Sequence, residues 1–158
     1  MKKVSDSSIT VVQQMVQQDA NLAGNIHGGT IMKLIDNTAG IVAARHTGRK
    51  NVVTASIDRL DFHNPVYISN LLRVSASINY IGKKSMEVGV RVEAENVITG
   101  EVRHTASAYL NFVALNDEGK AIELPPISFE SDAEIRRNRL ADERRKRRMA
   151  EKEMEKGV

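Results

Sequence analysis

The stretch from residue 29 to residue 46, GTIMKLIDNTAGIVAARH, contains the strongest helix signal in the body of the chain. Apolar side chains occupy nearly every side of this segment when it is drawn as a helix. A helix that is apolar all round is normally buried. The sequence therefore predicts one long helix inside the domain, covered by other elements.

Long runs of alternating apolar and polar residues follow this segment. A period of two is typical of strands with one buried face. The alternation runs through residues 72–80, 86–95 and 104–114, and further strands are expected at residues 52–62 and 10–16. The connections are short, which favours antiparallel neighbours. The expected fold class is α+β, with a curled antiparallel β-sheet around one long central helix.

The last part of the chain differs in composition from the rest. Pro125 and Pro126 close the expected body. Residues 130–156 contain no Pro or Gly, and opposite charges recur four positions apart, as in a solvated helix. We expect a domain at residues 8–127 and a charged helical tail at residues 128–158.

The composition excludes several functional classes. The chain has 158 residues, a net charge of +3 and no Cys, which excludes disulfides, thiolate nucleophiles and zinc sites built on sulfur. Aromatic residues make up only 4% of the chain, with no Trp. The basic run at residues 144–148 has no interleaved aromatics and is flanked by acids, so no nucleic-acid partner is expected.

The first residues lack the apolar core of a signal peptide, and no apolar stretch approaches the roughly 20 residues that cross a bilayer. A soluble cytoplasmic protein with no membrane partner is therefore expected. The four histidines have no metal-ligand spacing, so no metal site is expected. His27, inside a turn, and His46, at the end of the helix, suit structural roles.

The residues that lead into the helix, NLAGNIHGGT at positions 21–30, form the first candidate site. Gly28 and Gly29 would let a ligand approach the backbone closely. The first N–H groups of a helix are unpaired donors with a partial positive charge, and they can stabilise a developing oxyanion. A tight turn with no further role explains the Gly pair equally well.

Asp36 is the second candidate. Its neighbours one turn away are Met32, Ala39 and Gly40. A carboxylate on such a stripe of apolar and small residues pays a desolvation cost and becomes a stronger general base. The alternative is a buried structural Asp that caps a loop or pairs with a Lys.

The segment NLAGNIHGGTIMKLIDNTAG at positions 21–40 closely resembles the signature of the acyl-CoA thioester hydrolase family of the hotdog fold. The resemblance continues at residues 52–56, 61–62, 82–87 and 124–126 and covers most of residues 8–127. It implies the hotdog fold, in which a curled antiparallel sheet surrounds one helix. It also implies hydrolysis of fatty acyl-CoA to free fatty acid and CoA. No cofactor is implied, since CoA is part of the substrate.

The resemblance further implies roles for single residues. The family pairs an Asn before the His-Gly-Gly turn with an Asp in the helix, and these roles fall on Asn25 and Asp36. Asp36 would act either as general base to water or as a nucleophile that forms an anhydride. Two basic groups could bind the CoA phosphates: the turn Lys83, Lys84 and Ser85, and the residues after the helix, Arg45, Arg49 and Lys50. The resemblance favours the turn, which is otherwise an ordinary charged hairpin turn.

Helix geometry constrains the expected site. Gly29 and Asp36 are seven residues apart, which is roughly 10 Å along a helix axis, whereas reacting groups approach to about 3–3.5 Å. Asp36 is therefore expected to act on a carbonyl held by the Gly-rich turn of a partner chain. The homodimer would be the catalytic unit, and the family resemblance implies assembly as a hexamer, a trimer of dimers.

Two alternatives remain open at this stage. The hotdog fold also occurs in dehydratases and hydratases of acyl thioesters, which typically use a catalytic His, and fold alone does not choose between these activities. A non-catalytic acyl-CoA-binding protein is the other alternative.

Overall fold

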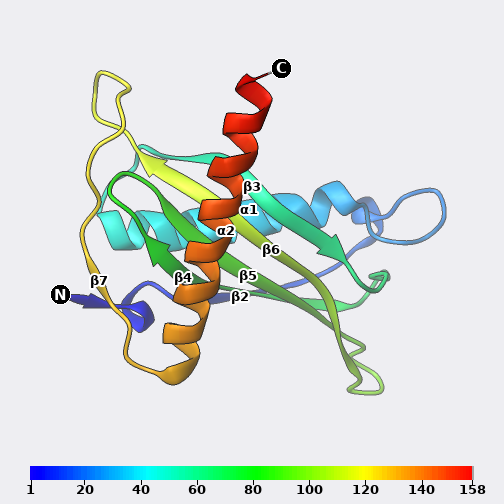
Figure 1. The fold of residues 1–158 in the computed structure, drawn as a ribbon. Helices are drawn as coiled ribbons and strands as arrows, with labels where there is room; N and C mark the ends of the chain where they lie inside the picture. Colours follow the sequence, from blue (N-terminus) through cyan, green and yellow to red (C-terminus); the bar gives the residue numbers. More distant parts are fainter. Residues whose placement is uncertain (158) are drawn as a thin grey trace.

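A computed structural model describes residues 1–157 and shows one long helix, α1 (Gly28–Thr47), packed against a five-stranded antiparallel sheet (Figure 1). The strand order is β2-β4-β5-β6-β3. The strands are β2 (Ile9–Gln14), β3 (Val52–Phe62), β4 (Leu71–Ile81), β5 (Met86–Glu95) and β6 (Val102–Ala114). The predicted fold class, a curled antiparallel sheet around a long helix, is confirmed.

The core lies between α1 and the inward face of the sheet. Alternate residues of the three central strands are buried there, as the period of two predicts. One side of α1 meets them, with the 3.6-residue spacing of a helix face. The buried residues of α1 are Ile31, Ile35, Thr38, Ala39, Val42, Ala43 and His46.

The opposite side of α1 is exposed, and the prediction of burial on all sides is wrong for the single chain. Met32, Asp36 and Ile41 are all exposed. One sheet covers only one side of a helix, so the apolar residues on the outer side have no partner within residues 1–157. Two of them, Met32 and Ile41, are among the large apolar side chains that remain open to solvent.

Short elements near the N-terminus brace the end of α1. β1 (Lys2–Lys3) pairs in parallel with β7 (Ile127–Ser128), and the 3₁₀ helices η1 (Val4–Asp6) and η2 (Gln17–Asp19) flank β2. The Nζ of Lys2 donates to the carbonyl of His46 at 2.8 Å, and a Lys at this position suits the negative end of a helix. These elements span two or three residues each, too few to show a periodic pattern in the sequence.

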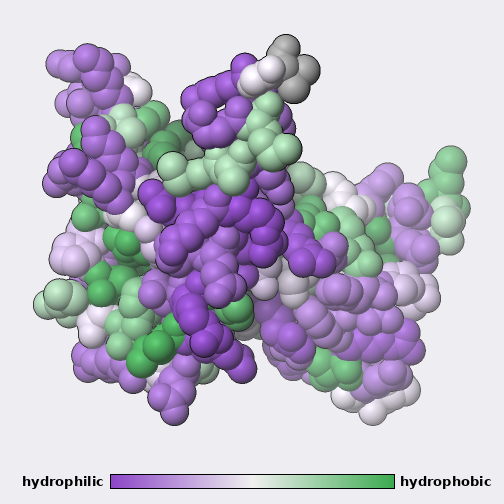
Figure 2. Space-filling model, in the orientation of Figure 1, coloured by the Kyte–Doolittle hydropathy of each residue, from purple (hydrophilic) through white to green (hydrophobic). Residues whose placement is uncertain are grey.

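α2 (Asp132–Lys156) crosses the face of the sheet opposite α1, and its C-terminal end extends beyond the sheet (Figure 1). The helix begins with a capping box, in which Ser131 Oγ accepts from Glu134 N and Glu134 Oε2 accepts from Ser131 N, each at 3.1 Å. The hydrogen bond from Ser131 lowers the pKa of Glu134. Hydrophilic residues cover most of this helix (Figure 2).

The charged helix at the end of the chain is thus confirmed, but it is not simply solvated. Ala141 is buried against the sheet, and Arg144 pairs with Glu87 of β5. Neither α2 nor any other helix of residues 1–157 combines the length and apolar character needed to cross a membrane.

The packing of α1 predicts a large effect of one core substitution. Ile35 is 1% exposed, and Ile35→Ala should lower the free energy of unfolding by about 2–5 kcal/mol, because it removes buried methylene groups and leaves a cavity. Urea denaturation at fixed protein concentration measures the change. The matched control is Ile98→Ala at a side chain that is 90% exposed, where the change should stay within about 0.5 kcal/mol. Equal losses for both variants would contradict this account of the core.

Candidate functional site

The loop before α1 is held together by the side chain of Asn21. Its Oδ1 accepts from the backbone N–H of Ala23 at 3.0 Å and from that of Asn25 at 3.2 Å. The backbone N–H of Asn21 donates to the carbonyl of Asn25 at 2.7 Å. Gly24 has a φ of 87°, a left-handed conformation that favours glycine. An Asn with a local acceptor role and a glycine thus set the shape of this loop.

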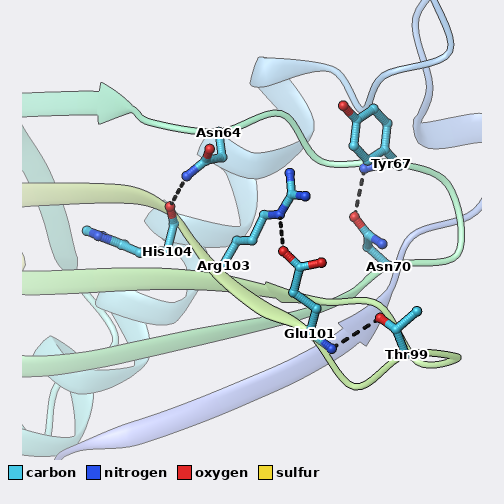
Figure 3. A network of polar contacts seen from close by, with 7 residues as sticks. All are labelled: Asn64, Tyr67, Asn70, Thr99, Glu101, Arg103 and His104. Atoms are coloured by element: carbon cyan, nitrogen blue, oxygen red, sulfur yellow. Dashed lines mark hydrogen bonds and ion pairs between the residues drawn. The ribbon is translucent and has the colours of Figure 1, made fainter.

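The same loop is attached to the connection between β3 and β4. The N–H of Ile26 donates to the carbonyl of Val66 at 2.8 Å, and Asn25 forms a β-bridge with Tyr67. The connection is braced in turn. The N–H of Tyr67 donates to Asn70 Oδ1 at 2.9 Å, and Asn64 Nδ2 donates to the carbonyl of His104 at 2.9 Å, as Figure 3 shows. The position of Asn25 is therefore fixed by backbone contacts.

A second polar group lies beside this connection. Arg103 Nε donates to Glu101 Oε1 at 2.9 Å, on the β5–β6 side of the network in Figure 3. The hydrogen bond and charge of Glu101 raise the pKa of Arg103. Both side chains are about half exposed. The ion pair therefore restricts the motion of these two side chains but contributes little to the stability of the fold.

The first turn of α1 offers free backbone donors. His27 is the N-cap and makes no capping hydrogen bond with its side chain. Within residues 1–157, the N–H groups of Gly28 and Gly29 have no acceptor, and both residues are exposed. A Cβ at Gly29 would meet nothing within 4 Å, so the backbone is open to an approaching group. A Cβ at Gly28 would lie 3.6 Å from the ring of Phe62, at the end of β3.

Asp36 lies further along the same helix and is held by β3. Thr54 Oγ1 donates to Asp36 Oδ1 at 2.6 Å. Asp36 is exposed, so the apolar surroundings expected from its neighbours on the helix are not supplied by one chain. Sequence reasoning missed Thr54. It lies in the stretch 52–56 that resembles the family, but its place in a strand does not by itself connect it to a carboxylate in another element.

The structure brings the predicted site residues into two groups. Asn25, Gly28 and Gly29 lie at the N-terminal end of α1, near Phe62. Asp36 lies with Thr54, roughly 10 Å along the helix axis from Gly29. The single chain does not place one bound carbonyl carbon within reach of both groups.

The turn between β4 and β5 carries the predicted phosphate-binding residues. Gly82 N donates to the carbonyl of Ser85 at 2.8 Å, and Leu124 N donates to that of Lys83 at 3.0 Å. Lys83 and Lys84 are exposed. The residue immediately after the turn, Met86, lies opposite Phe112, which lies opposite Thr54. Two strand spacings, about 10 Å, therefore separate this end of the turn from Thr54.

The remaining candidates have structural surroundings. His46 is buried, and its Nε2 lies 2.8 Å from the carbonyl of Pro125. The rings of His63 and His104 lie 4.8 Å apart. In the part of the chain that the structure describes, no three His, Cys, Asp or Glu residues gather as metal ligands. A cavity of about 730 Å³ lies between α2 and the outer face of the sheet, and its walls contain none of the predicted site residues.

Comparison with known proteins agrees with this fold. Residues 23–101 match the sequence pattern of a protein family described as the Thioesterase superfamily. The cytosolic acyl coenzyme A thioester hydrolase of Rattus norvegicus is 38% identical over 136 residues, which cover 85% of this chain and 35% of that protein. The chain thus spans about a third of the length of its mammalian relatives.

Solved structures extend the comparison. An acyl-CoA hydrolase from Staphylococcus aureus, in complex with butyryl coenzyme A and coenzyme A, is 37% identical with a TM-score of 0.89, and the match covers 99% of this chain and 94% of that one. A hexameric acyl-CoA thioesterase is 32% identical with a TM-score of 0.90, over 94% of this chain and 95% of that one. The chain belongs to the thioesterase superfamily and has the hotdog fold. Its relatives there are acyl-CoA thioester hydrolases, as the resemblance of residues 21–40 predicts.

The contacts of Asn21 predict how the loop responds to substitution. Asn21→Ala removes the acceptor of two backbone N–H groups, so the amides of Ala23 and Asn25 should exchange hydrogen at least several-fold faster. Asn21→Asp keeps an acceptor oxygen and should retain most of the protection. Hydrogen exchange resolved by mass spectrometry measures both. Equal exchange in the wild type and Asn21→Ala would show that this side chain does not hold the loop.

Proposed function

We propose that the protein hydrolyses fatty acyl-CoA to free fatty acid and CoA at a site shared by two subunits. The observation that carries this proposal is the pairing of Asp36 with Thr54 on an exposed helix face, while the free N–H groups of Gly28 and Gly29 lie at the end of the same helix. The relatives named above as acyl-CoA hydrolases, one of them in complex with butyryl coenzyme A, support the same substrate class.

The proposed chemistry assigns one task to each group. The N–H groups of Gly28 and Gly29, helped by the side-chain amide of Asn25, polarise the thioester carbonyl. Loss of one such donor typically costs about 3–4 kcal/mol of transition-state stabilisation. In one route Asp36 removes a proton from water, and the water oxygen attacks the carbonyl carbon. In the other route the Asp36 carboxylate itself attacks the carbonyl carbon and forms an anhydride, which water then opens. The C–S bond breaks, and the CoA thiolate takes up the proton.

The free edge of the sheet supports the proposal of a shared site. In the part of the chain that the structure describes, β3 has a strand neighbour, β6, on one side only. Its ends carry the two halves of the site, Thr54 beside Asp36 and Phe62 beside Gly28. An antiparallel pairing of two β3 strands centred on Asp58 would set Thr54 opposite Phe62 of the partner subunit. The Gly-rich turn of one subunit would then meet Asp36 of the other, and the exposed apolar residues of α1 would be covered.

The Staphylococcus aureus enzyme supports Asp36 and Thr54 and adds a second Asn. It has been solved with Ala replacing an Asp, an Asn fifteen residues before that Asp, and a Thr seventeen residues after it. In this chain Asn21 stands fifteen residues before Asp36, Asn25 stands eleven before it, and Thr54 stands eighteen after it. Within residues 1–157, neither Asn donates through its side-chain amide nitrogen. Asn21 is therefore proposed beside Asn25 as the amide that meets the substrate.

The rest of the assignment concerns the substrate grip and the assembly. The CoA phosphates would bind at Lys83, Lys84 and Ser85. The extended pantetheine arm of CoA would then reach from this turn to the thioester at Asp36. No separate cofactor takes part. The dimer would be the catalytic unit of a hexamer, as one solved relative is hexameric. The name of the rat relative supports a cytosolic location.

The first test is a direct assay of CoA release with a thiol-reactive dye, over a series of acyl chain lengths. The chain has no Cys, so the dye reports only released CoA. Asp36→Asn should lower kcat on the order of 10²–10⁴-fold while CoA binding persists, because side-chain volume is kept and the base is lost. His27→Ala should stay active, which would separate this reaction from a His-dependent hydration. Normal turnover by folded Asp36→Asn would remove Asp36 from the mechanism, and binding without release would identify an acyl-CoA-binding protein.

The second test mixes two inactive variants, Asp36→Ala and Asn25→Ala. After joint unfolding and refolding, half of the dimers should contain one chain of each variant. Each of these mixed dimers has one of its two sites intact. Activity should then return to about a quarter of the wild-type value, since each site draws on both chains. Asn21→Asp replaces Asn25→Ala in a parallel mixture and shows which Asn serves the site. If subunits exchange but neither mixture gains activity, the shared-site model is wrong.

A further inference from the structure

We propose that α2 positions the turn that binds CoA, through the ion pair of Arg144 with Glu87. This inference rests on the proposed function of the turn Lys83-Lys84-Ser85. It assigns Arg144 a role as a positioning residue that acts through Glu87 and Asn79 and does not itself touch the substrate.

The contact between α2 and the base of the hairpin is a buried polar network. Arg144 Nε donates to Glu87 Oε1 at 2.9 Å, and its Nη2 donates to Oε2 at 2.7 Å. The Glu87 side chain is only 2% exposed and that of Arg144 14%. Asn79 Nδ2 also donates to Glu87 Oε2, at 3.0 Å, and Asn138 Nδ2 donates to the carbonyl of Asn79 at 3.1 Å. Two residues of α2 thus hold one residue on each strand of the hairpin.

Asn79 sits in a β-bulge. Ile78 lies opposite Val88, but the next pair is Tyr80 with Glu87, so Asn79 is an extra residue in β4. Ile78 and Asn79 are consecutive and both buried, which breaks the alternation of the strand. A bulge bends its strand and changes the direction of the residues after it. Here the bend comes four residues before Lys83.

Gly89 makes room for this arrangement. A Cβ at this position would lie 2.4 Å from Asn79 Nδ2, closer than any side chain can tolerate. The absence of a side chain on β5 therefore lets Asn79 lie across the strand and reach Glu87. The bulge, the glycine and the ion pair form one unit beneath α2.

Within residues 1–157, few other polar contacts hold the turn itself. It has one internal backbone bond, from Gly82 to Ser85, and one from Leu124 to Lys83. The contact of Lys83 with Glu123, at 3.8 Å, joins two exposed side chains and contributes little. The base of the hairpin is held by its neighbours in the sheet, with Met86 in the core, and on its outer face by α2.

The Arg144–Glu87 ion pair is better suited to orient α2 on the sheet than to stabilise the fold. A buried ion pair seldom stabilises a protein more than apolar residues of similar size would. The planar guanidinium, by contrast, pairs here with both carboxylate oxygens through directional hydrogen bonds, which restrict the rotation and the sliding of the helix. Arg144 also lies 3.7 Å above the ring of Tyr109. The cavity beside these contacts lies along the first half of α2, from Ser131 to Arg144, so the helix does not pack closely against the sheet there.

The surroundings of Arg144 favour its charged form. Burial acts to lower the pKa of Arg144, but the hydrogen bonds and charge of Glu87 outweigh it, with smaller help from Tyr109 and Asp58, and the net pKa is raised. The guanidinium therefore stays charged.

The test compares two substrates that share an acyl group, an acyl-CoA and an acyl-N-acetylcysteamine thioester, which lacks the nucleotide. Arg144→Met should raise KM for acyl-CoA about tenfold, as expected for the loss of charged hydrogen bonds that orient the turn. Its kcat/KM for the truncated thioester should stay near the wild-type value. Arg147→Met, at an exposed position on α2, is the matched control and should change neither.

A double variant separates positioning from stability. Arg144→Met leaves Glu87 buried without its cation, which can unfold the protein, whereas Glu87→Met combined with Arg144→Met leaves no buried charge. The double variant should unfold near the wild-type temperature and still show the raised KM for acyl-CoA. A folded double variant with normal KM for acyl-CoA would overturn the proposal, and so would an equal loss with both thioesters.

Direct binding keeps this test independent of catalysis. If the wild type hydrolyses neither thioester, the proposed function fails. Titration of the protein with CoA then tests separately whether α2 positions the turn. Roughly tenfold weaker CoA binding by the double variant than by the wild type would support positioning of the turn. Equal CoA binding by the two proteins would refute it.

Discussion

The packing of one side of α1 against the apolar face of the sheet determines where each candidate site residue stands. Ile35, Ala39 and Val42 are fully buried in this contact, so the opposite stripe of the helix, with Asp36, faces outward. The helix is rigid, and the free N–H of Gly29 stays about 10 Å along the axis from Asp36. Any reaction that uses both groups must therefore draw them from two copies of the chain, which is the reason for the proposed shared site.

Most of the fold could be predicted from the sequence because its elements are long and periodic. Residues 52–62 and 86–95 form the expected strands with the expected bounds. The bulge at Asn79 could not be predicted, since one extra residue in a strand changes the phase of the alternation without leaving a motif. The outward side of α1 was also wrongly predicted as buried, because the sequence does not say whether a second chain covers it.

The candidate site was partly visible in the sequence. The glycine pair and Asp36 stand in or beside one helix, where spacing carries spatial information. Thr54 was not visible, because its contact with Asp36 depends on how β3 crosses the helix. The charges of residues 130–156 predicted a helix but not its docking, since Arg144 looks like any solvated Arg until Glu87 is placed beneath it.

The parallel pairing of β1 with β7 ties the beginning of the chain to the segment that leads into α2. The polypeptide between them is thereby closed into one large loop, and this contact lowers the conformational entropy of both ends. Within residues 1–157 each strand of the pair has no other strand partner, so a change at one end is transmitted to the other, alongside the separate contacts of Lys2 with α1 and of Arg144 with β5. The first three residues and the segment that leads into the C-terminal helix are in this sense joined, although they come from the two ends of the sequence.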